Sequence, residues 1–186
     1  MIDAGVPGLA GGAPIRRAPR LGVDVGSVRV GLAASDPDGI LATPVATLPR
    51  ATSLGQVEAE VRGRDAGCVY VGMPLHLSGA EGASARAALA YAESLALAVA
   101  PVPVRLLDER LSTTVAHQAL RASGRSSRDH RKVVDQAAAV VILQDALEAE
   151  RMTGRRPGTA VSVPVVGSSV VGKGDEDGGA SSGDGE

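Results

Sequence analysis

The sequence contains no phenylalanine and no tryptophan, and Tyr70 and Tyr91 are its only tyrosines. A hydrophobic core must therefore be built from Val, Leu, Ile and Ala, a composition that suits a parallel or mixed β-sheet covered by helices. The scarcity of aromatic side chains also disfavours recognition of single-stranded nucleic acid by base stacking, which depends on aromatic platforms.

Cysteine and long hydrophobic runs are equally scarce. Cys68 is the only cysteine and lies in the apolar run CVYVG, so we expect a small buried hydrophobe instead of a disulfide partner. No apolar run approaches the ~18 residues needed to cross a membrane, and the N-terminal residues do not follow the pattern of a signal peptide. We therefore predict a cytoplasmic protein with no membrane association.

The net charge of −2 is unevenly distributed along the chain. Residues 173–186 carry five acids and one lysine, and removing their net charge of −4 from the total of −2 leaves +2 for the rest. The basic residues concentrate in two places, namely Arg16, Arg17 and Arg20, and then Arg121, Arg125, Arg128, Arg131 and Lys132. This distribution is compatible with a polyanionic partner but does not identify one.

The length of 186 residues suits one domain with tails. Residues 1–19 are rich in Gly, Ala and Pro and are predicted to be a disordered extension. Residues 153–186 return to Gly, Ser and acids and are predicted to be a disordered tail, which leaves a single folded domain at 20–152. The valine-rich stretch 160–172 is unusual in such a tail, and either a disordered segment or a partner-dependent strand would explain it.

Within this domain the hydrophobic pattern predicts an α/β fold with a mixed five-stranded sheet in the order βββ-α-β-α-β-α-α. The strands are expected at residues 21–25, 28–34, 40–48, 68–71 and 104–107. The helices are expected at residues 53–64, 81–99, 112–124 and 132–152, with Ser53 capping the first of them.

Asp24 interrupts the apolar run of the first predicted strand, LGVDV. Burying a carboxylate is costly unless a metal, a proton or a partner compensates its charge. Gly26 and Gly31 are expected where the backbone turns sharply or another group approaches closely, and Arg29 adds a positive charge nearby. Asp24 is therefore the first functional candidate, and the alternative is a structural acid paired with Arg29.

Two further acidic positions occur where a core should be apolar. The predicted strand VRLL ends in Asp108-Glu109-Arg110, and open α/β sheets place their sites at such carboxyl ends. Asp135 begins a helical face that apolar residues continue three, four and seven positions on. Converging carboxylates are typical of sites for Mg²⁺ or Mn²⁺, and two such ions can promote phosphodiester hydrolysis. The plainer alternatives are a helix cap or an ion pair with Arg110 for the first two acids, and helix-dipole stabilisation for Asp135.

Four motifs that contain these residues occur in a fixed order. They are DVGSVRVGLA from Asp24, VGMPL from Val71, DERLST from Asp108 and DQAA from Asp135. Together they resemble the YqgF family, also called RuvX, of RNase H-like Holliday junction resolvases that are also assigned to maturation of pre-16S ribosomal RNA. Each motif is weak alone, but the ordered set is specific, and the resemblance covers residues 20–150.

The resemblance implies an RNase H-like fold, a monomer or homodimer, and a metal-dependent acidic triad. By matching position the triad falls on Asp24, Glu109 and Asp135, with Asp108 as a further candidate metal ligand. Related resolvases carry their second acid after the fourth strand, which here ends in Gly72-Met73-Pro74 without one. An acid after the fifth strand must reach across two strand spacings, ~10 Å, which favours Glu109 over the shorter Asp108.

Several basic residues accompany these motifs and are expected to contact phosphates without reading sequence. They are Arg29, Arg110, Arg125, Arg128, Arg131 and Lys132. Residues 125–131 are expected to form a basic loop before the last helix, and the alternative is an ordinary solvated loop.

We predict a metal-dependent nuclease, with two Mg²⁺ or Mn²⁺ ions, that acts on structured nucleic acid. Its expected substrate is the 5′ end of precursor 16S ribosomal RNA or a Holliday junction, and no residue reads a 2′-hydroxyl to decide between RNA and branched DNA. The alternative is a non-catalytic RNA- or ribosome-associated factor, which the weak basicity would suit. A sugar-kinase-like or actin-like phosphotransferase would share the Asp-x-Gly motif but needs a second lobe, for which the chain leaves little room.

Overall fold

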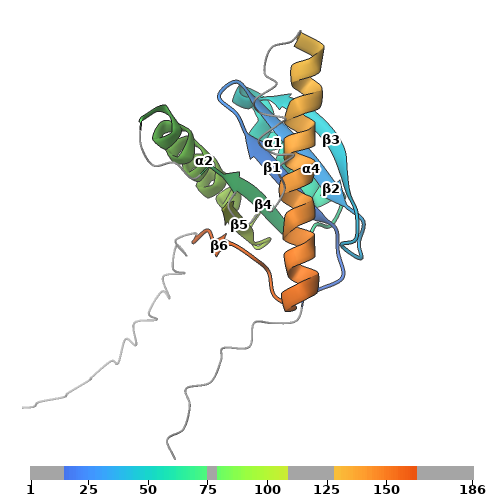
Figure 1. The fold of residues 1–186 in the computed structure, drawn as a ribbon. Coiled ribbons are helices and arrows are strands. Elements are labelled where there is room, and N and C mark those ends of the chain that lie inside the picture. Colours follow the sequence, from blue (N-terminus) through green and yellow to red (C-terminus); the bar gives the residue numbers. More distant parts are fainter. Residues whose placement is uncertain (1–14, 75–78, 109–127, 163–186) are drawn as a thin grey trace, which may run out of the picture.

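The computed structural model describes residues 15–74, 79–108 and 128–162, and for residues 79–81 and 128–135 it describes the backbone only. The strands are β1 (Arg20–Val25), β2 (Arg29–Ser35), β3 (Ala42–Pro49), β4 (Cys68–Met73), β5 (Val104–Asp108) and β6 (Thr159–Ala160). The helices are α1 (Arg50–Gly63), α2 (Gly79–Ala98) and α4 (Arg128–Thr153). The predicted RNase H-like α/β architecture is confirmed (Figure 1). The helix predicted at 112–124 lies outside the described residues.

The sheet has the strand order β3-β2-β1-β4-β5-β6. β2 is antiparallel to β1 and β3, whereas β4 and β5 run parallel to β1. We predicted five strands, and that number is wrong because β6 adds a sixth strand, antiparallel to β5. A strand of two residues is too short to show the alternation by which strands are predicted, so this one appeared as part of the C-terminal tail.

The helices cover the two faces of the sheet, with α1 and α2 on one face and α4 on the other (Figure 1). Because side chains alternate along each strand, the strands supply two separate cores. On the first face, Leu21 and Val23 of β1 pack with Val57 of α1 and Leu95 of α2. On the other face, residues such as Tyr70 of β4 pack against α4.

Glycines let α4 lie unusually close to the sheet. A Cβ atom at Gly22 of β1 would lie 2.6 Å from Leu143 Cβ and 2.8 Å from the Ala139 carbonyl oxygen. A Cβ atom at Gly72 of β4 would collide with the Ile142 side chain. A larger side chain at Gly22 would therefore require the helix to move away from the sheet, whereas one at Gly72 would require the Ile142 side chain to shift.

A buried polar cluster joins α4 to the start of β1. The Arg20 guanidinium donates to Glu150 Oε2 through Nε (3.0 Å) and Nη2 (2.7 Å), and the Tyr70 hydroxyl donates to Glu150 Oε1. Arg20 and Glu150 are each 5% exposed. Since Glu150 contacts the start of β1 while Ala139 contacts its middle, α4 runs antiparallel to β1.

All three described helices begin earlier than predicted, and α2 begins two residues earlier, at Gly79. α1 begins at Arg50, with Pro49 as its N-cap, so Ser53 is not the cap. Ser53 is instead fully buried, and its hydroxyl bonds the Arg50 carbonyl oxygen (2.9 Å) and the Tyr91 hydroxyl (3.0 Å). α4 begins at Arg128, so part of the predicted basic loop is helical. Among the described helices, none combines the length and the apolar character needed to span a membrane.

Candidate active site

Asp24 lies near the carboxyl end of β1, on the face that α4 covers. Its side chain shares this face with Gly22, two residues earlier, whose missing Cβ would touch α4. Across β2 its partner is Gly31, and on β4 the residue that follows the Val23–Val71 pair is Gly72. The neighbouring positions on β2 and β4 are therefore both glycines, and the Asp24 side chain between them is half-buried.

Position 135 of α4 lies level with Asp24. Gly22 faces Ala139 and Leu143, and Asp135 is four residues before Ala139 on the same side of the helix. Moving four residues along a helix covers about 6 Å, and moving two residues along a strand covers about 6.6 Å. Because α4 runs antiparallel to β1, these two steps lead in the same direction. The backbone therefore brings two of the predicted catalytic positions, 24 and 135, to one end of the sheet, although the Asp135 side chain is outside the described atoms.

The structure places Asp108 at the end of β5, paired with Met73 of β4. In β5, Val104 and Leu106 belong to the core on the α1 and α2 face, whereas Leu107 belongs to the core on the α4 face. By this alternation Asp108 points to the face opposite Asp24. β4 lies between β1 and β5, so the end of β5 is two strand spacings from β1, as we predicted. Glu109, the predicted third member of the triad, lies outside the described residues.

The turn from β1 to β2 is held by a residue that sequence reasoning missed. The Arg50 guanidinium donates to the carbonyl oxygens of Gly26 (2.8 Å) and Ala87 (3.2 Å), which joins the turn to α1 and α2. Within the turn, the Gly26 N–H donates to the Arg29 carbonyl oxygen (2.9 Å). Arg50 therefore fixes the backbone two residues beyond Asp24. Nothing in its local sequence distinguishes it from an ordinary arginine at the start of a helix.

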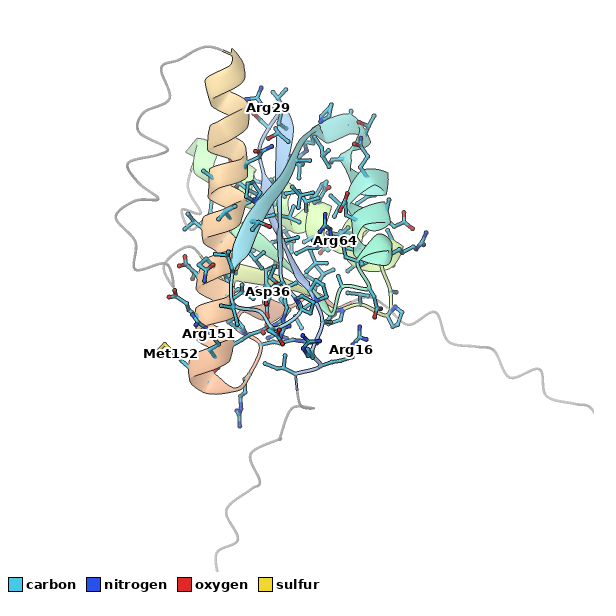
Figure 2. All side chains as sticks on the ribbon, turned by 90° about the vertical axis from the view of Figure 1, so that its right-hand side faces the viewer. Arg16, Arg29, Asp36, Arg64, Arg151 and Met152 are labelled. Atoms are coloured by element: carbon cyan, nitrogen blue, oxygen red, sulfur yellow. The ribbon has the colours of Figure 1, made fainter. Side chains whose placement is uncertain are left out.

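The predicted phosphate-binding residues lie partly at this same end. Figure 2 shows Arg29, the first residue of β2, at the end of the molecule where α4 begins. Arg128, Arg131 and Lys132 are in the first turns of α4, with side chains outside the described atoms. Arg110 and Arg125 lie outside the described residues altogether.

The other basic cluster of the sequence is neutralised by acids. Arg16 forms an ion pair with Asp65 (3.0 Å), and Arg17 forms one with Asp38 (2.5 Å). Arg20 is the buried partner of Glu150 described above. Because these charges are paired at the opposite end of the sheet, this cluster is not a free cationic surface.

Asp24 and Asp135 come from the same end of the sheet, and their residue type suits a hard divalent cation. Carboxylate oxygens are the ligands that Mg²⁺ and Mn²⁺ prefer. Within the described residues, no group of three or more His, Cys, Asp or Glu side chains is placed to hold a metal ion. Of the four predicted ligands, Asp24 and Asp108 have described side chains, and they point to opposite faces of the sheet. A metal at the α4 face would therefore take Asp24 and acids other than Asp108.

Comparison with protein families gives one match over most of the domain. Residues 18–149 match the family described as "RuvX: Holliday junction resolvase". A protein of Streptomyces coelicolor named "Putative pre-16S rRNA nuclease" is 50% identical over 162 residues, which cover 84% of this chain and 95% of that protein. A protein of Kineococcus radiotolerans with the same name is 54% identical over 149 residues, covering 78% of this chain and 79% of that protein.

Among solved structures, the chain is similar to one described as "T. thermophilus RuvC in complex with Holliday junction substrate". The TM-score is 0.49 at 16% identity, with 75% of this chain and 99% of that chain covered.

Proposed function

The chain belongs to the RuvX family, as its sequence motifs predicted, and we propose that it is a divalent-metal-dependent nuclease acting on structured nucleic acid. The observation that carries the proposal is the position of Asp24. It is a carboxylate near the carboxyl end of β1, with glycines on both neighbouring strands, and it is level with position 135 of α4. Two acidic positions that meet at the carboxyl end of a sheet supply the oxygen ligands that a divalent-cation site requires.

We assign the catalytic roles to Asp24, Glu109 and Asp135, which would also be the metal ligands. The side-chain alternation of β5 disfavours Asp108, because this residue has the parity of the α1 and α2 face, opposite to that of Asp24. Asp108 then has a supporting position beside Met73 instead of a ligand position.

Mg²⁺ or Mn²⁺ bound at these acids would supply water activation and stabilisation of the leaving oxygen. The chain itself orients the reacting groups. Arg50 holds the turn that follows Asp24, and Gly22 permits the close contact between β1 and α4. Arg29, together with the basic residues at the start of α4, would contact phosphates and position the backbone of the nucleic acid.

We propose the 5′ end of precursor 16S ribosomal RNA as the substrate, since the relatives that match most of the chain carry the name of such a nuclease. The description of the family favours a second candidate, the Holliday junction. A junction resolvase makes paired cuts and would require two coordinated sites, hence a homodimer, whereas a ribosomal RNA nuclease can act as a monomer. A precursor RNA substrate would agree with the predicted cytoplasmic location.

Cleavage of two labelled substrates, a precursor 16S RNA end and a four-way DNA junction, tests this proposal in the presence of Mg²⁺ or Mn²⁺. We expect RNA cleavage by the wild type and a loss of at least about a hundredfold in Asp24→Asn, which keeps the shape of the side chain but removes its charge. Asp108→Asn is the matched control and should retain more activity than Asp24→Asn.

Metal-dependent cleavage that persists in Asp24→Asn would contradict the assigned site. Paired symmetric nicks in the junction, with no RNA cleavage, would instead assign the chain to DNA resolution. If the wild type cuts neither substrate but binds the RNA, the non-catalytic factor is the better description.

A further inference from the structure

A short segment after α4 crosses to the far edge of the sheet. α4 ends at Thr153, and Gly154 follows with a positive φ of 65° and an N–H that donates to the Glu150 carbonyl oxygen (2.8 Å). We call residues 154–161, which include β6, the C-terminal strap. The match to the family ends at residue 149, so the strap lies outside the matched range.

The strap is attached to β5 through its backbone. β6 pairs antiparallel with β5, with Thr159 opposite Leu106 and Ala160 opposite Arg105. The Val161 N–H continues the ladder by donating to the Val104 carbonyl oxygen (2.9 Å). These bonds satisfy backbone groups on the side of β5 that β4 leaves open.

The Arg105 side chain of β5 fastens the same segment. Its Nε donates to the Pro157 carbonyl oxygen (2.6 Å), and its Nη2 donates to that of Gly158. A guanidinium bonded to two consecutive carbonyl oxygens fixes both the position and the direction of the strap. Arg105 therefore makes a bidentate contact that a lysine could reproduce only in part.

Gly158 marks the closest approach of the strap to β5. Its φ is 76°, and a Cβ atom there would collide with the Leu106 carbonyl oxygen and lie 3.5 Å from Leu107 Cα. The strap therefore reaches the level of Leu107, one residue before Asp108. Only glycine combines this φ with this close contact.

These contacts bear on the acids because β5 is the strand that leads into Asp108 and Glu109. β5 has five residues, and its neighbours in the sheet are β4 and the two-residue β6. Without the strap it would be a short edge strand, paired on one side only, and such strands open more readily.

We propose that the C-terminal strap is a positioning element of the active site, which acts through Arg105 to hold β5 and the carboxylate that follows it. Arg105 is in this sense a positioning residue, since its guanidinium is engaged with the strap and not with substrate. This inference rests on the proposed nuclease function and adds to it Arg105, a residue outside the four motifs of the sequence.

Variants of the full chain test the strap in three measurements. Arg105→Ala removes the bidentate contact. Gly158→Ala is designed to displace the strap while leaving the sequence of β5 unchanged. Arg105→Lys tests partial rescue. Arg155→Ala is the control, because Arg155 is an exposed strap arginine that, in the described part of the chain, donates no side-chain hydrogen bond to β5. The measurements are steady-state cleavage, Mn²⁺ binding by calorimetry, and amide hydrogen exchange of residues 104–108.

In Arg105→Ala and Gly158→Ala we expect faster exchange across residues 104–108 and a fall in kcat of about tenfold to a hundredfold, as misplacement of a catalytic group produces. KM for the nucleic acid should change by less than about twofold, because the phosphate-binding residues are intact. Mn²⁺ affinity should fall by about tenfold, the scale seen when a group that supports metal ligands is lost. Arg105→Lys should lie between these variants and the wild type, and Arg155→Ala should match the wild type.

Faster exchange in β5 with unchanged kcat and unchanged Mn²⁺ affinity would overturn the proposal and leave the strap as a purely structural element. Unchanged exchange in both variants would overturn it as well. A wild type that binds no Mn²⁺ and cuts no substrate would instead overturn the proposed nuclease function, a failure that the wild-type measurements alone reveal. Circular dichroism shows whether each variant is folded, and Gly158→Ala remains informative should Arg105→Ala not fold.

Discussion

Replacement of Glu150 by alanine should remove much of the stability of this fold. Glu150 Oε2 accepts two hydrogen bonds from Arg20, at 2.7 and 3.0 Å, and Oε1 accepts one from the Tyr70 hydroxyl. All three side chains are buried. Glu150→Ala would therefore leave a guanidinium without its counter-charge and a hydroxyl without its acceptor, in the interior between β1, β4 and α4.

The expected loss follows from the burial of the pair. Removing one partner of a buried ion pair costs about 3–5 kcal/mol, because the remaining charge stays out of water without compensation. Arg20 would retain its contacts to the carbonyl oxygens of Ala18 and Pro37, which places the loss within that range and not above it. A domain of ordinary stability has about 5–15 kcal/mol in total. For a chain of this length, the loss corresponds to a fall in Tm of roughly 6–20 °C.

Urea unfolding followed by circular dichroism measures this loss, and Glu148→Ala provides the control. Glu148 lies on the same helix at 3.9 Å from Arg151, with side chains 56% and 53% exposed, so its removal should cost no more than about 1 kcal/mol. The buried cluster is far from Asp24 along β1, so cleavage per folded molecule should be unchanged. If Glu150→Ala and Glu148→Ala differ by less than about 1 kcal/mol, the reasoning about the buried pair is refuted.

Three further outcomes follow from single positions. Gly22→Ala should destabilise the protein by about 1–3 kcal/mol in urea unfolding, because its Cβ atom would overlap α4. Gly55→Ala, in open space on α1, should stabilise the protein by about 0.5–1 kcal/mol. Equal effects of the two substitutions would contradict the close packing at Gly22. Backbone N–H groups, first of all that of Leu41, lower the pKa of the Asp36 carboxyl below 3.8 in the folded state. The resulting stability is present above the ordinary pKa and is lost as the pH falls through the lower folded value. In Asp36→Asn, the free energy of unfolding should therefore fall less steeply as the pH is lowered. Burial raises the pKa of the Cys68 thiol from 9.0 to about 11, so a thiol reagent at mildly alkaline pH should label unfolded protein much faster than native protein.

Much of the fold was predictable because it depends on local periodicity. Alternation along a strand has a period of two and shows itself within five or six residues, which is why β1, β2, β4 and β5 were placed within one or two residues of their ends. A carboxylate inside such a run is equally visible, so Asp24 could be singled out from the sequence. The order of four motifs was enough to predict the family.

The errors came from elements whose limits depend on distant groups. Ser53 looked like a helix cap, but its hydroxyl bonds Tyr91, 38 residues away, and the helix begins three residues earlier at Arg50. β6 forms because β5 offers an open edge and Arg105 binds the segment before it, neither of which a two-residue strand reveals by itself.

The sequence by itself determined the composition of the core, the strand pattern, the acidic candidates and the family, since each of these depends on residue type and short-range spacing. The tertiary structure alone decided which face each side chain occupies and which distant groups meet. It directs Asp24 toward α4 and Asp108 away from it, and it joins Arg20 to a glutamate 130 residues later. The physical reason is that facing and pairing follow from how the helices pack on the sheet, and this packing depends on contacts between residues far apart in the chain.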